Sequence, residues 1–200
     1  MIDKHFVTAQ SLLDDSYLLA HTIIESDFRP DFLVAPWRGG TPIGIAVHEY
    51  FEMCGLTLDH NPIKTSKYDN GCIDQPHKSV SVFGLEYFVE KADEDDKVLL
   101  IDDIFDTGLS MQEILHQWKI IADKSGRSVP NDIRIATVYY KPSRNETDPR
   151  ILPDYHVHKE EGWIVFPHEL GGLKPDEIIM AKGNYIAKLL EIDTKRVTRK

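Results

Sequence analysis

The segment from residue 97 to residue 124 constrains the fold of this chain more than any other part. Residues 97–103, Lys-Val-Leu-Leu-Ile-Asp-Asp, have an apolar centre and end in two acids, as a central strand of a parallel sheet can. Residues 106–110, Asp-Thr-Gly-Leu-Ser, form a break that opens a helix expected over residues 109–124. The segment therefore predicts a strand, a loop and a helix in succession, with polar side chains at the end of the strand.

Further strands and helices are expected on both sides of this unit. Apolar spacing and turn residues predict helices over 12–24, 43–54 and 175–192, and strands over 31–36, 56–59, 79–84, 132–140 and 154–157. Residues 61–78, rich in Asn, Asp, Pro, Gly and Lys, are expected to form a long functional loop. Alternating strands and helices indicate an α/β fold with a mostly parallel sheet flanked by helices. Ligands of such sheets bind outside the carboxyl ends of the strands.

Composition excludes several classes of partner. The chain has 23 basic and 33 acidic residues, which give a formal net charge of −10. This balance argues against a nucleic-acid partner and against binding to an anionic membrane surface. The two cysteines, Cys54 and Cys72, form neither a disulfide framework nor a zinc motif, so we expect a reducing, cytoplasmic compartment. No secretory signal and no membrane-spanning segment are expected.

The loop at residues 106–110 has the chemistry of a phosphate site. Hydroxyl side chains, a glycine and the amide groups of a helix N-terminus can together hold a phosphate. The preceding acids, Asp102 and Asp103, repel phosphate but can bind a divalent cation or accept hydrogen bonds from sugar hydroxyls. A nucleotide hydrolase would require a Gly-Lys-Ser or Gly-Lys-Thr motif, which the chain lacks. A helix cap at Asp106 and Thr107 would explain one acid but not the two on the strand.

Residues 102–110, Asp-Asp-Ile-Phe-Asp-Thr-Gly-Leu-Ser, resemble the diphosphoribosyl-binding motif of type I phosphoribosyltransferases. Leu109 departs from the family pattern, in which this position is often small or polar. Residues 34–44 resemble the pyrophosphate-binding loop of the same family, in which Arg38 can supply positive charge and Gly39 close backbone approach. The resemblance also implies a cis peptide bond between Trp37 and Arg38.

A third segment favours one subclass of this family. Tyr139-Tyr140-Lys141-Pro142 and residues 163–169 resemble the base-binding part of 6-oxopurine phosphoribosyltransferases, with the xanthine-guanine and hypoxanthine-guanine enzymes closest in pattern. Lys141 can donate a hydrogen bond to purine O6, and Trp163 can stack on the ring. The backbone of Ile164 and the region of Glu169 can meet the exocyclic 2-position. The structural alternatives are a core tryptophan and a surface lysine.

The resemblance implies a Mg²⁺-dependent transfer of a phosphoribosyl group from 5-phosphoribosyl 1-diphosphate (PRPP) to a purine base. In this interpretation Asp106 is the general base near purine N7, and Asp102 and Asp103 hold ribose hydroxyls, with Asp103 also the metal ligand. The residues expected to hold the 5′-phosphate are Thr107, Gly108, Leu109 and Ser110. The loop 61–78 is expected to close over the site, with Ser66, Tyr68 and Lys78 as candidates to contact pyrophosphate.

The chain is expected to be a single domain over residues 1–200, with a core at about 30–160 and a small hood from about 1–30 and 160–200. Family members usually form homodimers or homotetramers. A phosphoribosyltransferase for another base, or a non-catalytic regulator that senses PRPP, remains an alternative. His156 and His158 share one strand face, but lack a third ligand nearby except Glu160, which favours a structural role over a metal site. His168, next to Glu169, is likewise expected to be structural.

Overall fold

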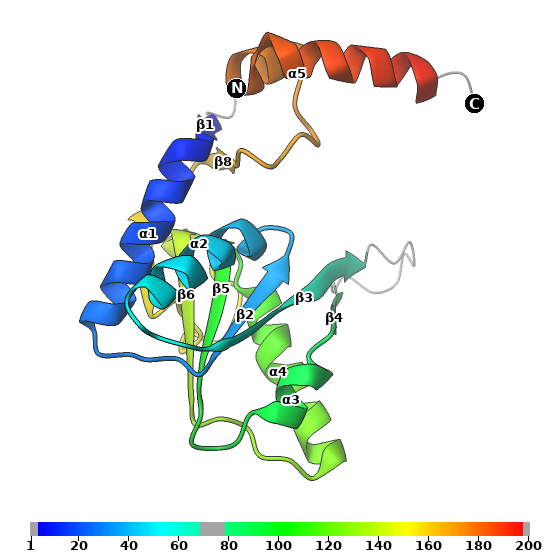
Figure 1. The fold of residues 1–200 in the computed structure, drawn as a ribbon. Helices are drawn as coiled ribbons and strands as arrows, with labels where there is room; N and C mark the ends of the chain where they lie inside the picture. The colour runs from blue at the N-terminus through cyan, green and yellow to red at the C-terminus, as the bar shows by residue number, and fades with distance from the viewer. Residues whose placement is uncertain (1–3, 69–78, 198–200) are drawn as a thin grey trace. The chain divides into compact units, whose positions relative to one another are not determined.

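A computed structural model describes residues 4–68 and 79–197 of the chain (Figure 1). The chain divides into two compact units. The larger unit contains residues 13–161, and the smaller one combines residues up to Leu12 with those from Gly162 onward. No helix in the described part of the chain is both long enough and apolar enough to cross a membrane.

The larger unit is built on a six-stranded sheet. Its strands are β2 (Phe32–Trp37), β3 (Asp59–Tyr68), β4 (Ser79–Phe83), β5 (Lys97–Phe105), β6 (Asp132–Tyr140) and β7 (Tyr155–Lys159). They lie in the order β4-β3-β2-β5-β6-β7, and every neighbouring pair is parallel except β3 with β4. The centre of β5, from Val98 to Ile101, is fully buried, as its apolar sequence predicts.

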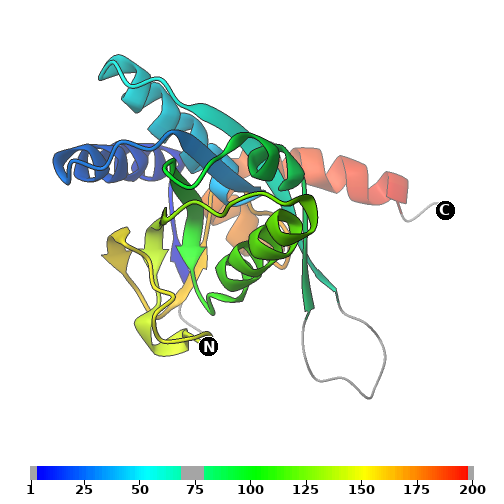
Figure 2. The same ribbon diagram turned by 90° about the horizontal axis from the view of Figure 1, so that it is seen from below.

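Helices cover both faces of this sheet (Figures 1 and 2). Helices α1 (Ala9–Glu25) and α2 (Gly40–Met53) lie on one face, and α3 (Glu86–Lys91) and α4 (Leu109–Ser125) lie on the other. Trp118 of α4 is completely buried and stacks at a tilt against Phe88 of α3, with 6.1 Å between ring centroids. A short 3₁₀ turn, Pro142–Arg144, follows β6. The fold is therefore the predicted α/β type with a mostly parallel sheet.

The smaller unit contains a two-stranded parallel sheet and a helix. Strand β1 (Lys4–Phe6) pairs with β8 (Trp163–Val165), and helix α5 spans Pro175–Val197. Gly183 interrupts α5 with φ 84° and ψ 166°, so this helix consists of two segments. Lys4 of β1 forms an ion pair with Glu177 at 2.7 Å, which links the sheet to the first turn of α5.

The expected elements are confirmed in most of the chain, and the differences have physical reasons. The strand expected at 56–59 begins only at Asp59, and residues 61–68, expected as a loop, continue it as β3. Inward-facing positions of β3 include the polar Asp59, Asn61 and Thr65, so the strand lacks apolar alternation and depends on pairing with β2 and β4. Strands β1 and β8 and helix α3 are too short to show a periodicity, and they were not expected.

Candidate active site

The carboxyl ends of three adjacent strands, β2, β5 and β6, bring the expected PRPP-binding and catalytic residues together. Strand β5 lies between β2 and β6, and all three run in the same direction. The segments that follow them, starting at Arg38, Asp106 and Lys141, therefore leave the same edge of the sheet. The backbone amide of Lys141 donates to the carbonyl of Phe105 at 2.9 Å, which joins the last two of these segments directly.

The loop after β2 packs closely against the end of β5. The peptide bond between Trp37 and Arg38 is cis, as the family resemblance implies. A Cβ atom added to Gly39 would lie 2.5 Å from the Asp103 carboxylate, and one added to Gly40 would lie 2.3 Å from the carbonyl oxygen of Ile101. Only glycine permits this close approach, so the expected pyrophosphate loop lies directly against Asp103.

Asp102 and Asp103 present two carboxylates at the end of β5. The side chain of Asp102 accepts a hydrogen bond from the backbone amide of Asp103 at 2.9 Å. Asp103 is 7% exposed, and its carboxylate lies directly against Gly39, where a side chain would clash with it. Carboxylate oxygens are the ligand type that Mg²⁺ prefers. Asp103 is thus suited to hold the metal.

The loop between β5 and α4 forms a cradle at a helix N-terminus. Gly108 adopts a left-handed conformation with φ 77° and is the N-cap of α4, which it leaves without a side-chain hydrogen bond. The N-cap residue therefore offers no side-chain acceptor to the first amides of α4, those of Leu109 and Ser110. Thr107 and Ser110 add hydroxyl groups that are half-buried. This combination suits a phosphate group.

Asp106 lies between two cationic side chains. Arg144 places Nε 3.0 Å from Asp106 Oδ1, and Lys141 places Nζ 3.9 Å from Oδ2. The contact with Arg144 is an ion pair. Within the described residues, Asp106 Oδ1 is a buried oxygen that accepts no hydrogen bond. This oxygen thus has hydrogen-bonding capacity that the described residues leave unused, while Arg144 and Lys141 offset its charge.

The surroundings of Lys141 exclude a surface role for this lysine, because its side chain is only 4% exposed. Glu161 supports the following turn by accepting hydrogen bonds from the backbone amide and the hydroxyl of Ser143. The same hydrogen bonds, together with the charges of Lys141 and Arg144, lower the pKa of Glu161. Arg144 was not expected from the sequence. Its position three residues after Lys141, in a Pro-Ser-Arg turn, is the one local signal of its role.

The other expected purine-binding residues belong to the smaller unit. Trp163 is 53% exposed, so its interpretation as a core residue is wrong. Ile164 is buried next to it in β8, and Glu169 accepts a hydrogen bond from the backbone amide of Phe166 at 3.0 Å. Lys182 of α5 donates to the carbonyl oxygens of Phe166 and Pro167, and burial lowers its pKa. Trp163 and Glu169 are therefore held on one strand-and-turn segment of this unit.

The residues expected on a mobile loop have different positions. Ser66 lies within β3, opposite Ser81 of β4, and Tyr68 is the last residue of β3. A loop position is therefore wrong for both. Lys78 lies outside the described residues. Their expected contact with pyrophosphate stays a prediction.

The paired histidines of β7 have different surroundings. His158 Nε2 lies 2.9 Å from Asp15 Oδ2, within hydrogen-bonding distance, and burial lowers the pKa of His156. The structural role expected for both stays a prediction. His168 stacks on Phe166, with 5.6 Å between ring centroids.

Taken together, the strand ends define an α/β protein whose loops after β2, β5 and β6 hold the residues expected to bind PRPP. Residues 7–173 match the model of the phosphoribosyl transferase domain family. The chain belongs to this family, and its expected fold is thereby confirmed. No curated protein sequence matches the chain.

Similar solved structures share the fold over most of their length. A purine phosphoribosyltransferase from Pyrococcus horikoshii Ot3 is 21% identical, with a TM-score of 0.63 over 86% of this chain and 98% of that one. A hypothetical protein from Neisseria gonorrhoeae with bound ppGpp is 18% identical, with a TM-score of 0.70 over 94% and 98%. The xanthine-guanine-hypoxanthine phosphoribosyltransferase of Helicobacter pylori is 21% identical, with a TM-score of 0.58 over 82% and 92%.

Proposed function

We propose that this protein transfers the 5-phosphoribosyl group of PRPP to a 6-oxopurine base, that is guanine, hypoxanthine or xanthine. The products are the purine nucleoside 5′-monophosphate and pyrophosphate, as in purine salvage. The observation that carries the proposal is the position of Asp106, a carboxylate flanked by Lys141 and Arg144 whose Oδ1 accepts no hydrogen bond from the described residues. Such a group can receive the proton that a purine loses when it forms a glycosidic bond.

Each side chain then has a defined part in the reaction. Purine N9 bonds to C1′ of the ribose while the bond between C1′ and the pyrophosphate oxygen breaks, and Asp106 takes the proton from N7. Lys141 donates a hydrogen bond to O6, which adenine lacks, and Trp163 stacks on the base. Ile164 and Glu169 contact the exocyclic 2-position. Positive charge develops on the ribose as pyrophosphate leaves, so nearby carboxylates stabilise the transition state.

The sugar and its phosphates are held by the three loops. Thr107, Gly108, Leu109 and Ser110 hold the 5′-phosphate with hydroxyl and amide groups. Arg38 and the amide of Gly39 bind pyrophosphate. The arginine offsets its negative charge, and the backbone N–H donates a hydrogen bond to it. Asp102 and Asp103 accept hydrogen bonds from the ribose hydroxyls. Mg²⁺ bound at Asp103 would offset charge on the pyrophosphate leaving group.

A panel of bases tests this proposal. The protein is mixed with Mg²⁺, PRPP and guanine, hypoxanthine, xanthine or adenine, and nucleotide formation is measured. Turnover with at least one 6-oxopurine and not with adenine is expected. No turnover with any 6-oxopurine would show that the proposal is wrong.

The role of Asp106 is tested by Asp106→Asn, which should lower kcat by about 10²–10⁴-fold because the proton acceptor is lost. The KM for PRPP should change by less than about threefold, since the amide keeps the shape of the carboxylate. Asp148→Asn is the matched control, because Asp148 also pairs with an arginine, Arg150, at 2.6 Å. Equal losses of kcat and PRPP affinity in Asp106→Asn would remove its assignment as the base.

A second candidate function is the binding of ppGpp at this site. The protein from Neisseria gonorrhoeae that shares the fold has this nucleotide bound, and ppGpp carries both a 6-oxopurine and phosphates. In this proposal ppGpp competes with PRPP and inhibits the transfer. Inhibition that excess PRPP relieves would support it, and tight ppGpp binding without any turnover would favour a regulator instead.

The setting of the enzyme completes the proposal. Cys54 is a free, exposed thiol, which suits the reducing compartment expected from the sequence, the cytoplasm. A homodimer or homotetramer, the usual state in the family, is part of the same proposal. Size-exclusion chromatography with light scattering measures it directly.

A further inference from the structure

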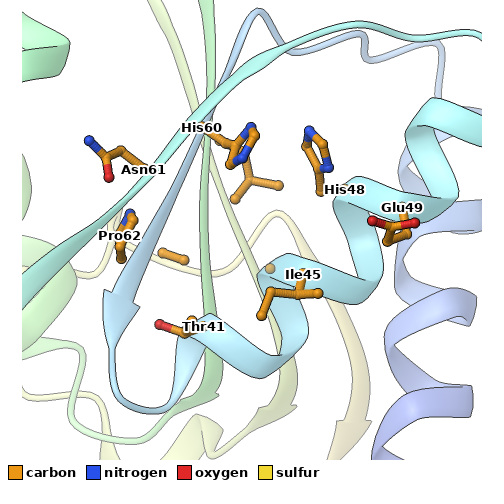
Figure 3. A pocket seen from close by; sticks show the side chains of 10 residues that line it. Thr41, Ile45, His48, Glu49, His60, Asn61 and Pro62 are labelled. Atoms are coloured by element: carbon orange, nitrogen blue, oxygen red, sulfur yellow. The ribbon is translucent and has the colours of Figure 1, made fainter.

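A pocket lies apart from the residues assigned to catalysis, on the face of the sheet that α2 covers. It has a volume of about 240 Å³, and its floor includes Leu33 and Ala35 of β2. Helix α2 forms one wall and the first half of β3 the other (Figure 3). Gly44 lets α2 pack closely on β2 here, since a Cβ added to it would lie 3.1 Å from the Cβ of Ala35.

Side chains with metal-binding atoms gather in and beside this pocket. His48, Glu49 and Glu52 of α2 each offer a ligand atom, and these atoms lie within 4.8 Å of one another. His48 and Glu52 are one helical turn apart, with 3.9 Å between Nδ1 and Oε2. His60 of β3 lies against His48, with 4.0 Å between ring centroids (Figure 3). The three clustered ligand groups thus lie on α2, and His60 of β3 adds a second imidazole beside His48.

We infer that His48, Glu49, Glu52 and His60 form a binding site for a divalent cation of borderline softness, with Zn²⁺ as its ligand. Imidazole and carboxylate together are a ligand set that Zn²⁺ accepts, whereas Mg²⁺ prefers oxygen ligands alone. The site therefore differs in chemistry from the Asp103 site. His48 is only 16% exposed, so its ring is held near the carboxylates by the protein around it.

The position of this site gives it a mechanical consequence. A cation bound there joins the last two turns of α2 to the start of β3. The other end of α2 begins at Gly40, directly after the loop expected to hold pyrophosphate. Bound Zn²⁺ should consequently stabilise the folded chain, because the unfolded chain does not hold these four groups together.

A His–Glu pair on another helix serves as a control, because any such pair could have some affinity for Zn²⁺. His116 and Glu113 of α4 lie closer together than His48 and Glu52, with 3.5 Å between Nδ1 and Oε2. Among the described residues, however, no further ligand joins them in a cluster. His116→Gln is therefore the control variant, because it removes a pair of the same type without the additional ligands.

The experiment measures Zn²⁺ binding to the full chain, without a polyhistidine tag, by calorimetry in millimolar Mg²⁺. One Zn²⁺ per chain and a higher thermal unfolding temperature are expected. His48→Gln and His60→Gln should each weaken binding by at least about tenfold, and His116→Gln should bind as the unaltered protein does. Co²⁺ in place of Zn²⁺ should give visible absorption bands that the two pocket variants lose.

Two results would overturn the inference: absence of Zn²⁺ binding, or equal affinity in His60→Gln and the unaltered protein. His60 is exposed, so its substitution leaves the fold intact even if His48→Gln does not fold. Circular dichroism of each variant establishes this point. The outcome does not depend on phosphoribosyl transfer, because binding and unfolding are measured without substrates.

Discussion

The contact between Gly39 and Asp103 provides the sharpest test of the site's geometry. Gly39 has φ −61° and ψ −48°, a conformation that alanine adopts without strain. In Gly39→Ala the new Cβ would lie 2.5 Å from the carboxyl carbon and both oxygens of Asp103. The substitution therefore changes this contact and leaves the backbone preference of the loop unaffected.

The size of the effect follows from this distance. Ordinary contact of a Cβ atom begins at 3.4 Å, so the Asp103 carboxylate and the loop must separate by about 1 Å. A displacement of about 1 Å in a catalytic arrangement costs about 100-fold in rate, which corresponds to about 2.7 kcal/mol of transition-state stabilisation. We expect kcat/KM for PRPP to fall by this factor in Gly39→Ala.

The assay follows nucleotide formation at saturating base and varied PRPP. Gly171→Ala is the matched control, since a Cβ at that glycine meets no atom within 4 Å. Thermal unfolding of both variants establishes that each is folded at the assay temperature, because overpacking itself costs about 1–3 kcal/mol. When Gly39→Ala is added to Asp103→Ala, kcat/KM should fall almost no further, because the carboxylate that the new Cβ would contact is absent.

A kcat/KM in Gly39→Ala within about threefold of the unaltered enzyme would refute the reasoning, because the predicted displacement would then not matter. A loss that persists fully in the double variant would also refute it. That result would trace the effect to the loop itself instead of to Asp103.

Three further predictions follow from the structure. Gly108→Ala should destabilise the protein by about 1–3 kcal/mol, because Gly108 has φ 77° and an added Cβ would lie 2.6 Å from Phe105 Cζ. An unchanged midpoint of urea unfolding would contradict this. Burial lowers the pKa of His156 from 6.5, so its contribution to stability is present above pH 6.5 and is lost as pH falls through the folded pKa. In His156→Gln the free energy of unfolding should therefore depend less on pH in this range. An unchanged pH dependence would show that His156 does not cause it. Removal of divalent ions by EDTA should abolish nucleotide formation and Mg²⁺ should restore it, whereas activity in EDTA would exclude the proposed metal at Asp103.

The central strands could be predicted from the sequence because burial on both faces demands a continuous apolar run. Strand β6 has the predicted bounds, 132–140, and β5 extends the predicted 97–103 by two residues. Strand β3 could not be predicted in the same way. Its backbone pairs with β2 on one side and β4 on the other, and this pairing overrides a polar sequence.

The acids and glycines of the candidate site could also be predicted, because they lie within single strand–loop–helix segments. The surroundings of Asp106 could not. Arg144 lies 38 positions further along the chain, and only the parallel pairing of β5 with β6 brings it near. The contact of His60 with His48 of α2 has the same origin, since His60 comes from a strand that its own sequence does not predict.

The sequence alone thus determined the fold class and the residues with the chemistry for phosphate, metal and base, since apolar runs and short motifs act over a few neighbouring positions. The tertiary structure decided which charges meet. Asp106 lies between Arg144 and Lys141, Gly39 lies against Asp103, and Trp163 is exposed rather than in the core. These contacts depend on strand order and backbone pairing, which are set by packing across the whole sheet and not by any local pattern.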